Sequence, residues 1–394
     1  PLMKKAGFKA HYAAAIEAVA SNGGQFAPPV MGATAFLIAE FLQMNYIDVV
    51  IAAIVPASLY YVCLFLQVDA IALRDGLHGL PKKDLPKASK VLKKGWVFLL
   101  PLGFLLYLLF WRGFNPAVAA LWSVGALLIL SSLLRRRFLT LKEWGALIVG
   151  GGENMLPLLM IGGGVGVVIG VMNITGLGFS LSLVLTQIGA NAGMLVMLML
   201  TGVIAIILGM GMPTAAIYVV LSVILAPAIV DMGVSPIAAH LFIFYFGLLS
   251  FLTPPVAIAS FVAAGLAGSK IWPTSWSGVQ LAAVAYILPF LWCFNEALLL
   301  QGSTIANIYA VITALVAALL IAKALQIMVE RTRSSLGIGL LVFGGGLVVG
   351  SSTIWLGNES VLTLIVAGTG ISILVLISTY WHQGHVFMAS KKQY

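Results

Sequence analysis

The chain has 394 residues, of which 61% are hydrophobic and only 8% are charged, and its mean hydropathy is +1.09. So few charges cannot cover so much apolar surface in water, which excludes a soluble domain and predicts an all-α polytopic membrane protein in the lipid bilayer. The net charge of +9 does not indicate nucleic-acid binding, because the basic residues lie in short clusters between apolar segments.

These basic clusters predict the topology, because the positive-inside rule assigns each of them to the cytoplasm. They lie at residues 4–9, 74–94, 135–142, 270, 323–333 and 391–392. Two spans between neighbouring clusters satisfy the rule: 10–41 and 47–72, 96–111 and 117–134, 146–172 and 237–267, 277–299 and 305–325, 335–355 and 361–381. Of the 21 Lys and Arg only Arg112 then lies outside, and the C-terminus is cytoplasmic. The remaining apolar stretch, 192–226, fits this topology only if it enters and leaves the membrane on the same side.

The first predicted span, residues 10–41, contains the sequence "GGQFAPP", in which Gly23 and Gly24 precede the tandem prolines Pro28 and Pro29. Prolines remove backbone donors and break a helix. In lipid, the freed carbonyl groups must be buried in protein or line a watery cavity. Carbonyl oxygens without a nearby carboxylate suit a hard monovalent cation. The alternative is a proline kink that only shapes helix packing.

A predicted hairpin occupies residues 192–230. Two apolar runs of its sequence, each too short to cross the bilayer comfortably, flank "GMGMPTAA" at Gly209–Ala216. Glycines and Pro213 predict the turn, and Thr214 is placed to bind an ion or to cap the returning helix. An ordinary tight turn between two short spans is the alternative.

The predicted span 237–267 contains a second tandem proline, "FLTPPVAIAS". Residues 1–33 align with residues 227–259 without a gap, including Pro-Pro-Val in both. The predicted topology runs the two copies in opposite directions, which is the inverted-repeat plan of secondary transporters. Counterparts of residues 142–226 are not found before Pro1, so we expect the N-terminal part of the first repeat, with its own hairpin, to be missing.

The predicted domain organisation follows from this repeat. Residues 1–73 are the end of repeat one, 74–145 a basic cytoplasmic loop with a connecting helix pair, 146–326 repeat two, and 327–394 an extension with two spans. Paired carboxylates, a zinc-ligand motif and a nucleophile–base set are not visible in the sequence, so we expect neither an enzyme nor a cofactor. An ion channel or other pore is the alternative to a transporter.

Three stretches carry a family resemblance: "EAVASNGGQFAPPVMGATAFLIAEFL", "GMGMPTAAIYVVLSVILAPAIVDMG" and "LLSFLTPPVAIASFVAAGLAGS". They resemble the large permease subunit of tripartite ATP-independent periplasmic (TRAP) transporters, in the fused-permease branch that works with TAXI-type binding proteins. The resemblance covers about residues 1–330. It implies an elevator-type secondary transporter of prokaryotic inner membranes, driven by sodium and supplied with an organic acid by a periplasmic binding protein. We expect the small-subunit helices that this branch normally carries at its N-terminus to be missing here.

The resemblance also implies the binding residues. One sodium site would lie between the hairpin tip and the second break, at Gly209, Gly211, Pro213, Thr214, Thr253 and Pro254. The other would pair the first break, at Gly23, Gly24, Ala27 and Pro28, with a hairpin tip that this sequence does not contain. The substrate would lie between them, at Asn22, Gln25, Thr214 and Ser250. We further expect Thr214 and Thr253 to bind the same ion.

Overall fold

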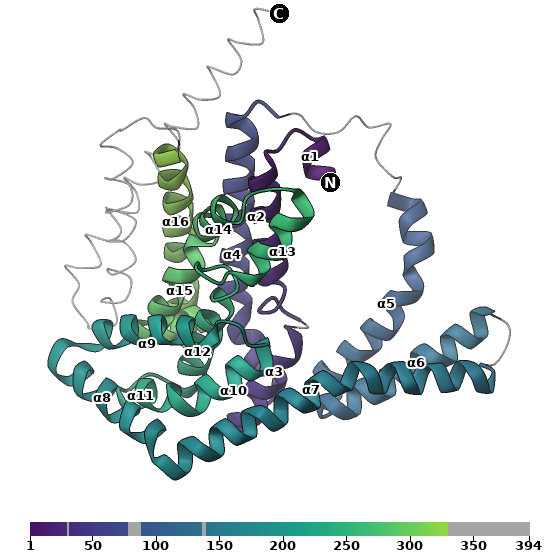
Figure 1. The fold of residues 1–394 in the computed structure, drawn as a ribbon, viewed down its shortest axis with the longest axis horizontal. Helices are drawn as coiled ribbons and strands as arrows, with labels where there is room; N and C mark the ends of the chain where they lie inside the picture. Colours follow the sequence, from purple (N-terminus) through teal and green to yellow (C-terminus); the bar gives the residue numbers. More distant parts are fainter. Residues whose placement is uncertain (30, 78–87, 136–138, 330–394) are drawn as a thin grey trace, which may run out of the picture.

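The computed structural model describes residues 1–29, 31–77, 88–135 and 139–329 (Figure 1). The predicted spans 335–355 and 361–381 and the predicted cytoplasmic C-terminus lie outside these residues. The described parts form helices without a strand. The helices are α1 (Leu2–Lys5), α2 (Ala10–Gly23), α3 (Gly32–Phe41), α4 (Tyr46–Arg74), α5 (Ala88–Phe110), α6 (Pro116–Arg135), α7 (Leu141–Thr175), α8 (Leu177–Ala192), α9 (Met194–Gly209), α10 (Thr214–Ile224), α11 (Ala226–Asp231), α12 (Pro236–Leu249), α13 (Ile258–Ala267), α14 (Ile271–Leu281), α15 (Ala283–Phe294), the 3-10 helix η2 (Glu296–Leu299) and α16 (Thr304–Val329).

Several helices have the length and composition of membrane spans. Three of the described stretches can each cross a bilayer by themselves: Tyr46–Arg74, Pro116–Leu134 and Ile271–Phe294. A fourth crossing is possible if Gly166–Met172 and Leu177–Ala192, bent by 67°, act as one span. The span prediction left residues 173–191 unassigned, whereas most of them form α8. The part of the chain that the structure describes is therefore all-helical, with the apolar spans of a multi-pass membrane protein.

Both helices with tandem prolines are broken in the structure. In the first, α2 ends at Gly23 and α3 begins at Gly32; in the second, α12 ends at Leu249 and α13 begins at Ile258. Pro28-Pro29 and Pro254-Pro255 are both cis peptide bonds. Met31 and Ala257, directly before α3 and α13, both have a positive φ, of 50° and 40°.

The sequence alignment of the two copies extends to their helix ends. When residue 1 is placed on residue 227, α2 and α12 begin and end at aligned positions, and so do α3 and α13. The glycines ahead of the breaks, Gly7 and Gly233, are also aligned, and their φ values are 101° and 91°. Two stretches with few identities thus have the same local backbone.

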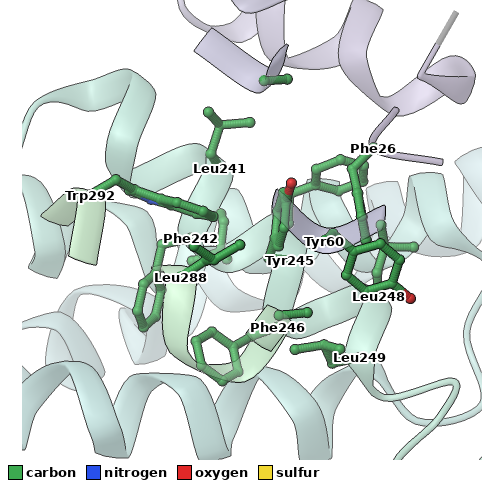
Figure 2. Close-up of a cluster of buried hydrophobic side chains, with 14 of the residues drawn as sticks. Phe26, Tyr60, Leu241, Phe242, Tyr245, Phe246, Leu248, Leu249, Leu288 and Trp292 are labelled. Atoms are coloured by element: carbon green, nitrogen blue, oxygen red, sulfur yellow. The ribbon is translucent and has the colours of Figure 1, made fainter. Parts of the chain in front are cut away.

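Helix α12 lies at the centre of the core. Every residue from Ile237 to Leu249 is buried, as expected for a helix that is apolar on all sides. Figure 2 shows the aromatic side chains around it, where Tyr245 stacks on Phe26 of the first break with ring centroids 4.3 Å apart and meets Trp292 of α15 at 4.9 Å. The Trp292 indole donates a hydrogen bond to the Ala238 carbonyl, 3.1 Å away. This core holds the second broken helix against α15 and the first break.

Helices α5, α6 and much of α7 project from this core (Figure 1). Their large apolar side chains are exposed, as at Leu99, Leu121 and Ile148. In a membrane protein such a surface faces lipid, where apolar exposure carries no penalty.

Candidate functional site

The hairpin of α9 and α10 packs tightly against the end of α12. A Cβ atom at Gly209, the last residue of α9, would lie 2.9 Å from Ser250 Oγ and 3.1 Å from the Gly247 carbonyl oxygen. A Cβ at Gly247 would lie 2.5 Å from Ile217 of α10. Only glycine allows backbones to approach this closely. The hairpin tip is thereby held at the second break, near the predicted substrate residue Ser250.

The other side of the hairpin tip reaches the first break. Thr214, the first residue of α10, donates a hydrogen bond from Oγ1 to Gln25 Oε1 over 2.6 Å. The helix N-cap is Pro213, and no side chain caps this end. Of the two roles expected for Thr214, capping is therefore not seen, because Thr214 is already the first residue inside the helix and its hydroxyl accepts no backbone N–H there. One hairpin tip contacts both breaks.

The two breaks also contact each other. Asn22, buried near the end of α2, donates a hydrogen bond from Nδ2 to the Leu248 carbonyl oxygen over 3.2 Å. Leu248 is the residue aligned with Asn22 between the two copies. The structure thus brings the predicted substrate residues Asn22, Gln25, Thr214 and Ser250 into one region, joined by these contacts.

The carbonyl groups at the ends of α2 and α12 accept hydrogen bonds, whereas the sequence predicts that the tandem prolines leave them unpaired. At the first break, the carbonyls of Ser21, Asn22 and Gly23 accept from the N–H groups of residues 24–26. At the second break, the carbonyls of residues 247–249 accept from the N–H groups of residues 250–252 in the same way. The expectation of unpaired carbonyls is thus corrected to carbonyls that accept hydrogen bonds in a tight turn. At the second break each of them accepts a side-chain donor as well, from Ser250 Oγ to Gly247, from Asn22 Nδ2 to Leu248 and from Thr253 Oγ1 to Leu249.

Two tyrosines of α4 donate hydrogen bonds to carbonyl groups near the end of α2, just before the first break. The Tyr60 hydroxyl donates to the Val19 carbonyl over 2.8 Å, and the Tyr61 hydroxyl donates to the Ala20 carbonyl over 3.0 Å. A Cβ at Gly23 would lie 2.5 Å from the Tyr60 ring. Gly23 is therefore required by close packing, and the predicted cation residues Gly24, Ala27 and Pro28 follow it in the break.

At the second break, the hydroxyl of Thr253 has two partners. Its Oγ1 donates to the Leu249 carbonyl over 2.6 Å and lies 2.7 Å from the Tyr286 hydroxyl of α15. Thr253 and Thr214 thus bond different residues, and their sharing of one ion stays a prediction. Sequence reasoning missed Tyr286, although the offset of 226 residues that relates the two breaks also relates Tyr286 to Tyr60 when it is carried beyond residue 33.

A cavity of about 680 Å³ lies between α2 and α13, and such volumes hold small molecules. Asn22 and Gln25 are among its polar lining residues, together with Glu17, Ser21 and Lys4. Lys4 donates from Nζ to the Ala267 carbonyl at the end of α13, 2.7 Å away. The other two predicted substrate residues, Thr214 and Ser250, do not line this cavity.

Charged metal ligands are not gathered in the described part of the chain. No group of three or more His, Cys, Asp or Glu side chains that could hold a metal ion occurs there. Cys63 and Cys293 are separate, buried thiols. The oxygen atoms available at the two breaks are those of hydroxyl, amide and carbonyl groups, which favour a monovalent cation over a divalent one.

Comparison with known proteins places most of the chain in one family. Residues 1–306 match the family described as "Tripartite ATP-independent periplasmic transporter, DctM component". The chain belongs to the DctM family. This is a family of transporter permeases and not of enzymes.

One relative within the TRAP permeases is the "Isethionate TRAP transporter permease protein DctMQ" of Oleidesulfovibrio alaskensis. It is 31% identical to this chain over 105 residues, which are 27% of this chain and 16% of the relative. The aligned part is therefore a small share of that protein. The DctM match covers both breaks and the hairpin.

Proposed function

We propose that this DctM-family chain is the permease of a sodium-coupled secondary transporter that imports a small organic anion across a prokaryotic inner membrane. The observation that carries this proposal is the hairpin tip in contact with both broken helices, through Gly209 at Ser250 and Thr214 at Gln25. A hairpin whose tip lies at the meeting point of two broken helices can open the site between them to one side of the membrane when it moves. A channel, the alternative function, needs a continuous path instead, and family membership favours the transporter.

Inverted repeats support an elevator mechanism. The aligned helix bounds of α2–α3 and α12–α13 indicate one duplicated unit, and inverted repeats of broken helices commonly enclose a site near the bilayer midplane. One repeat unit would then move against the rest and carry the site across the membrane. The lipid-exposed helices α5, α6 and α7 are suited to the part that stays fixed.

Sodium is the proposed coupling ion because the oxygens at the breaks carry no net charge. Carbonyl and hydroxyl oxygens bind a hard monovalent cation without the carboxylates that a divalent ion needs. We propose two sodium sites. One comprises the hairpin tip with Thr253 and Pro254, and the other comprises the first break from Gly23 to Pro28.

The substrate proposal rests on the polar residues between the breaks. Asn22 and Gln25 line the cavity, and their amide groups can donate hydrogen bonds to an anion. The relative named for isethionate, a small organic anion, agrees with this class of solute. A periplasmic TAXI-type binding protein would deliver the substrate, and small-subunit helices would complete the permease.

The test is transport by the protein reconstituted in liposomes with its binding protein and imposed ion gradients. We expect uptake of the binding protein's ligand when sodium is higher outside, and little uptake when choline replaces sodium. Omission of the binding protein should also reduce uptake strongly. Uptake that persists unchanged without sodium, or that needs ATP, contradicts the coupling proposal.

A further inference from the structure

The second break contains a pair of hydroxyl groups whose protons can be assigned. Thr253 has one hydroxyl proton, and its 2.6 Å bond to the Leu249 carbonyl uses it, since a carbonyl can only accept. The Tyr286 hydroxyl, 2.7 Å from the same Oγ1, must then be the donor to Thr253. The Thr253 proton is thus donated to the Leu249 carbonyl, and the Tyr286 proton is donated to Thr253 Oγ1.

This arrangement leaves oxygen lone pairs without a partner. Thr253 Oγ1 accepts one hydrogen bond and keeps one lone pair, and Tyr286 Oη has given its proton and keeps its acceptor capacity. Within the described residues, the Tyr286 hydroxyl has Thr253 as its hydrogen-bond partner and no other. Both oxygens have lone pairs free and no further proton to donate, and two such neighbouring oxygens can coordinate a cation.

The first break lacks this pair. The residue aligned with Thr253 is Ala27, and the same offset of 226 residues places Tyr60 at the position of Tyr286. Tyr60 instead donates its proton to the Val19 carbonyl over 2.8 Å, before the break, where it buttresses α2. The same tyrosine position therefore has two different surroundings, and only the one at the second break faces a side-chain hydroxyl.

We propose that Tyr286 is a direct ligand of the cation at the second break, together with Thr253 Oγ1. Both hydroxyl groups are uncharged, so the ion that they bind is a hard monovalent cation such as Na⁺. This inference rests on the proposed sodium coupling and adds to it a ligand from α15, outside the hairpin and the broken helices. Binding at this position ties α15 to the broken helix.

The test measures sodium binding directly, as the rise in the unfolding temperature of the purified protein when NaCl replaces choline chloride at constant ionic strength. We expect Tyr286→Phe to raise the sodium concentration at half-effect roughly tenfold, as expected for the loss of one oxygen ligand. Tyr309→Phe is the control. It removes a buried hydroxyl of α16 that has no hydrogen-bond partner within the described residues, so the sodium midpoint should stay unchanged.

A second pair of variants tests the same site without altering the tyrosine. Thr253→Val should raise the sodium midpoint, whereas Thr253→Ser, which keeps the hydroxyl, should not. A wild-type midpoint in Tyr286→Phe, or equal shifts in Tyr286→Phe and Tyr309→Phe, would overturn the inference while leaving sodium coupling intact. A wild-type protein that shows no sodium-dependent stabilisation would overturn sodium coupling itself.

Discussion

Thr214 and Gln25 join the hairpin to the first break through a single side-chain hydrogen bond of 2.6 Å. Because both belong to the proposed substrate region, we predict that Thr214→Val and Gln25→Leu each raise the substrate KM. The loss in binding free energy of the double variant should be smaller than the sum of the losses of the two single variants. The difference, the coupling energy, should be about 0.5–3 kcal/mol, as for residues that share a contact. The measurement is a double-mutant cycle on uptake. Thr201→Val is the control, because the Thr201 hydroxyl bonds the Met197 carbonyl within α9; strictly additive effects of Thr214 and Gln25 contradict the prediction.

His240 of α12 and Tyr218 of α10 form a second link between the hairpin and a broken helix. The Tyr218 hydroxyl lies 2.7 Å from His240 Nδ1, and both side chains are buried. Tyr218→Phe leaves that nitrogen without a partner, so we predict a loss of about 1–3 kcal/mol in the free energy of unfolding. Tyr245→Phe is the control. The Tyr245 hydroxyl is buried without a hydrogen-bond partner, so its removal should be neutral or stabilising. Equal stability of the two variants in thermal unfolding would show that the link to His240 is not needed.

At the scale of the elements, the fit of the hairpin against α12 depends on glycine. A Cβ added at Gly247 would lie 2.5 Å from Ile217 Cγ2 and 3.2 Å from Leu221 Cδ1. We therefore predict that Gly247→Ala pushes α10 away, lowers stability by about 1–3 kcal/mol and reduces uptake. Gly265→Ala in α13 is the control, since a Cβ there meets no atom within 4 Å. It should be neutral or stabilising, because alanine is the better helix former. A stable, fully active Gly247→Ala protein would show that the hairpin packs more loosely than the structure indicates.

At the scale of the whole molecule, the distribution of charge predicts which loops face the cytoplasm. Both cysteines are buried, Cys63 at 1% and Cys293 at 6% relative exposure, so a membrane-impermeant maleimide should not label the native protein. We predict that Asn45→Cys, in the exposed loop between α3 and α4, is labelled in intact cells. Lys270→Cys, on the predicted cytoplasmic side, should be labelled only after permeabilisation. The reverse pattern would invert the topology.

The sequence by itself determined the class of protein, the positions of both broken helices and the location of the hairpin. These follow from local physics, because apolar length sets the spans and tandem prolines break a helix wherever they fall. It also identified Asn22, Gln25, Thr214 and Ser250 as one group, through a family resemblance rather than through spacing.

Only the tertiary structure decided which groups meet at the site. Thr253 bonds Tyr286, 33 residues away, and Thr214 bonds Gln25, 189 residues away. No local pattern encodes such pairs, because they depend on how α15 and the hairpin pack around α12. The helix-end carbonyls likewise accept hydrogen bonds in tight turns that proline positions alone do not predict. Local sequence sets where a helix must break, whereas the contacts at the break are set by residues far along the chain.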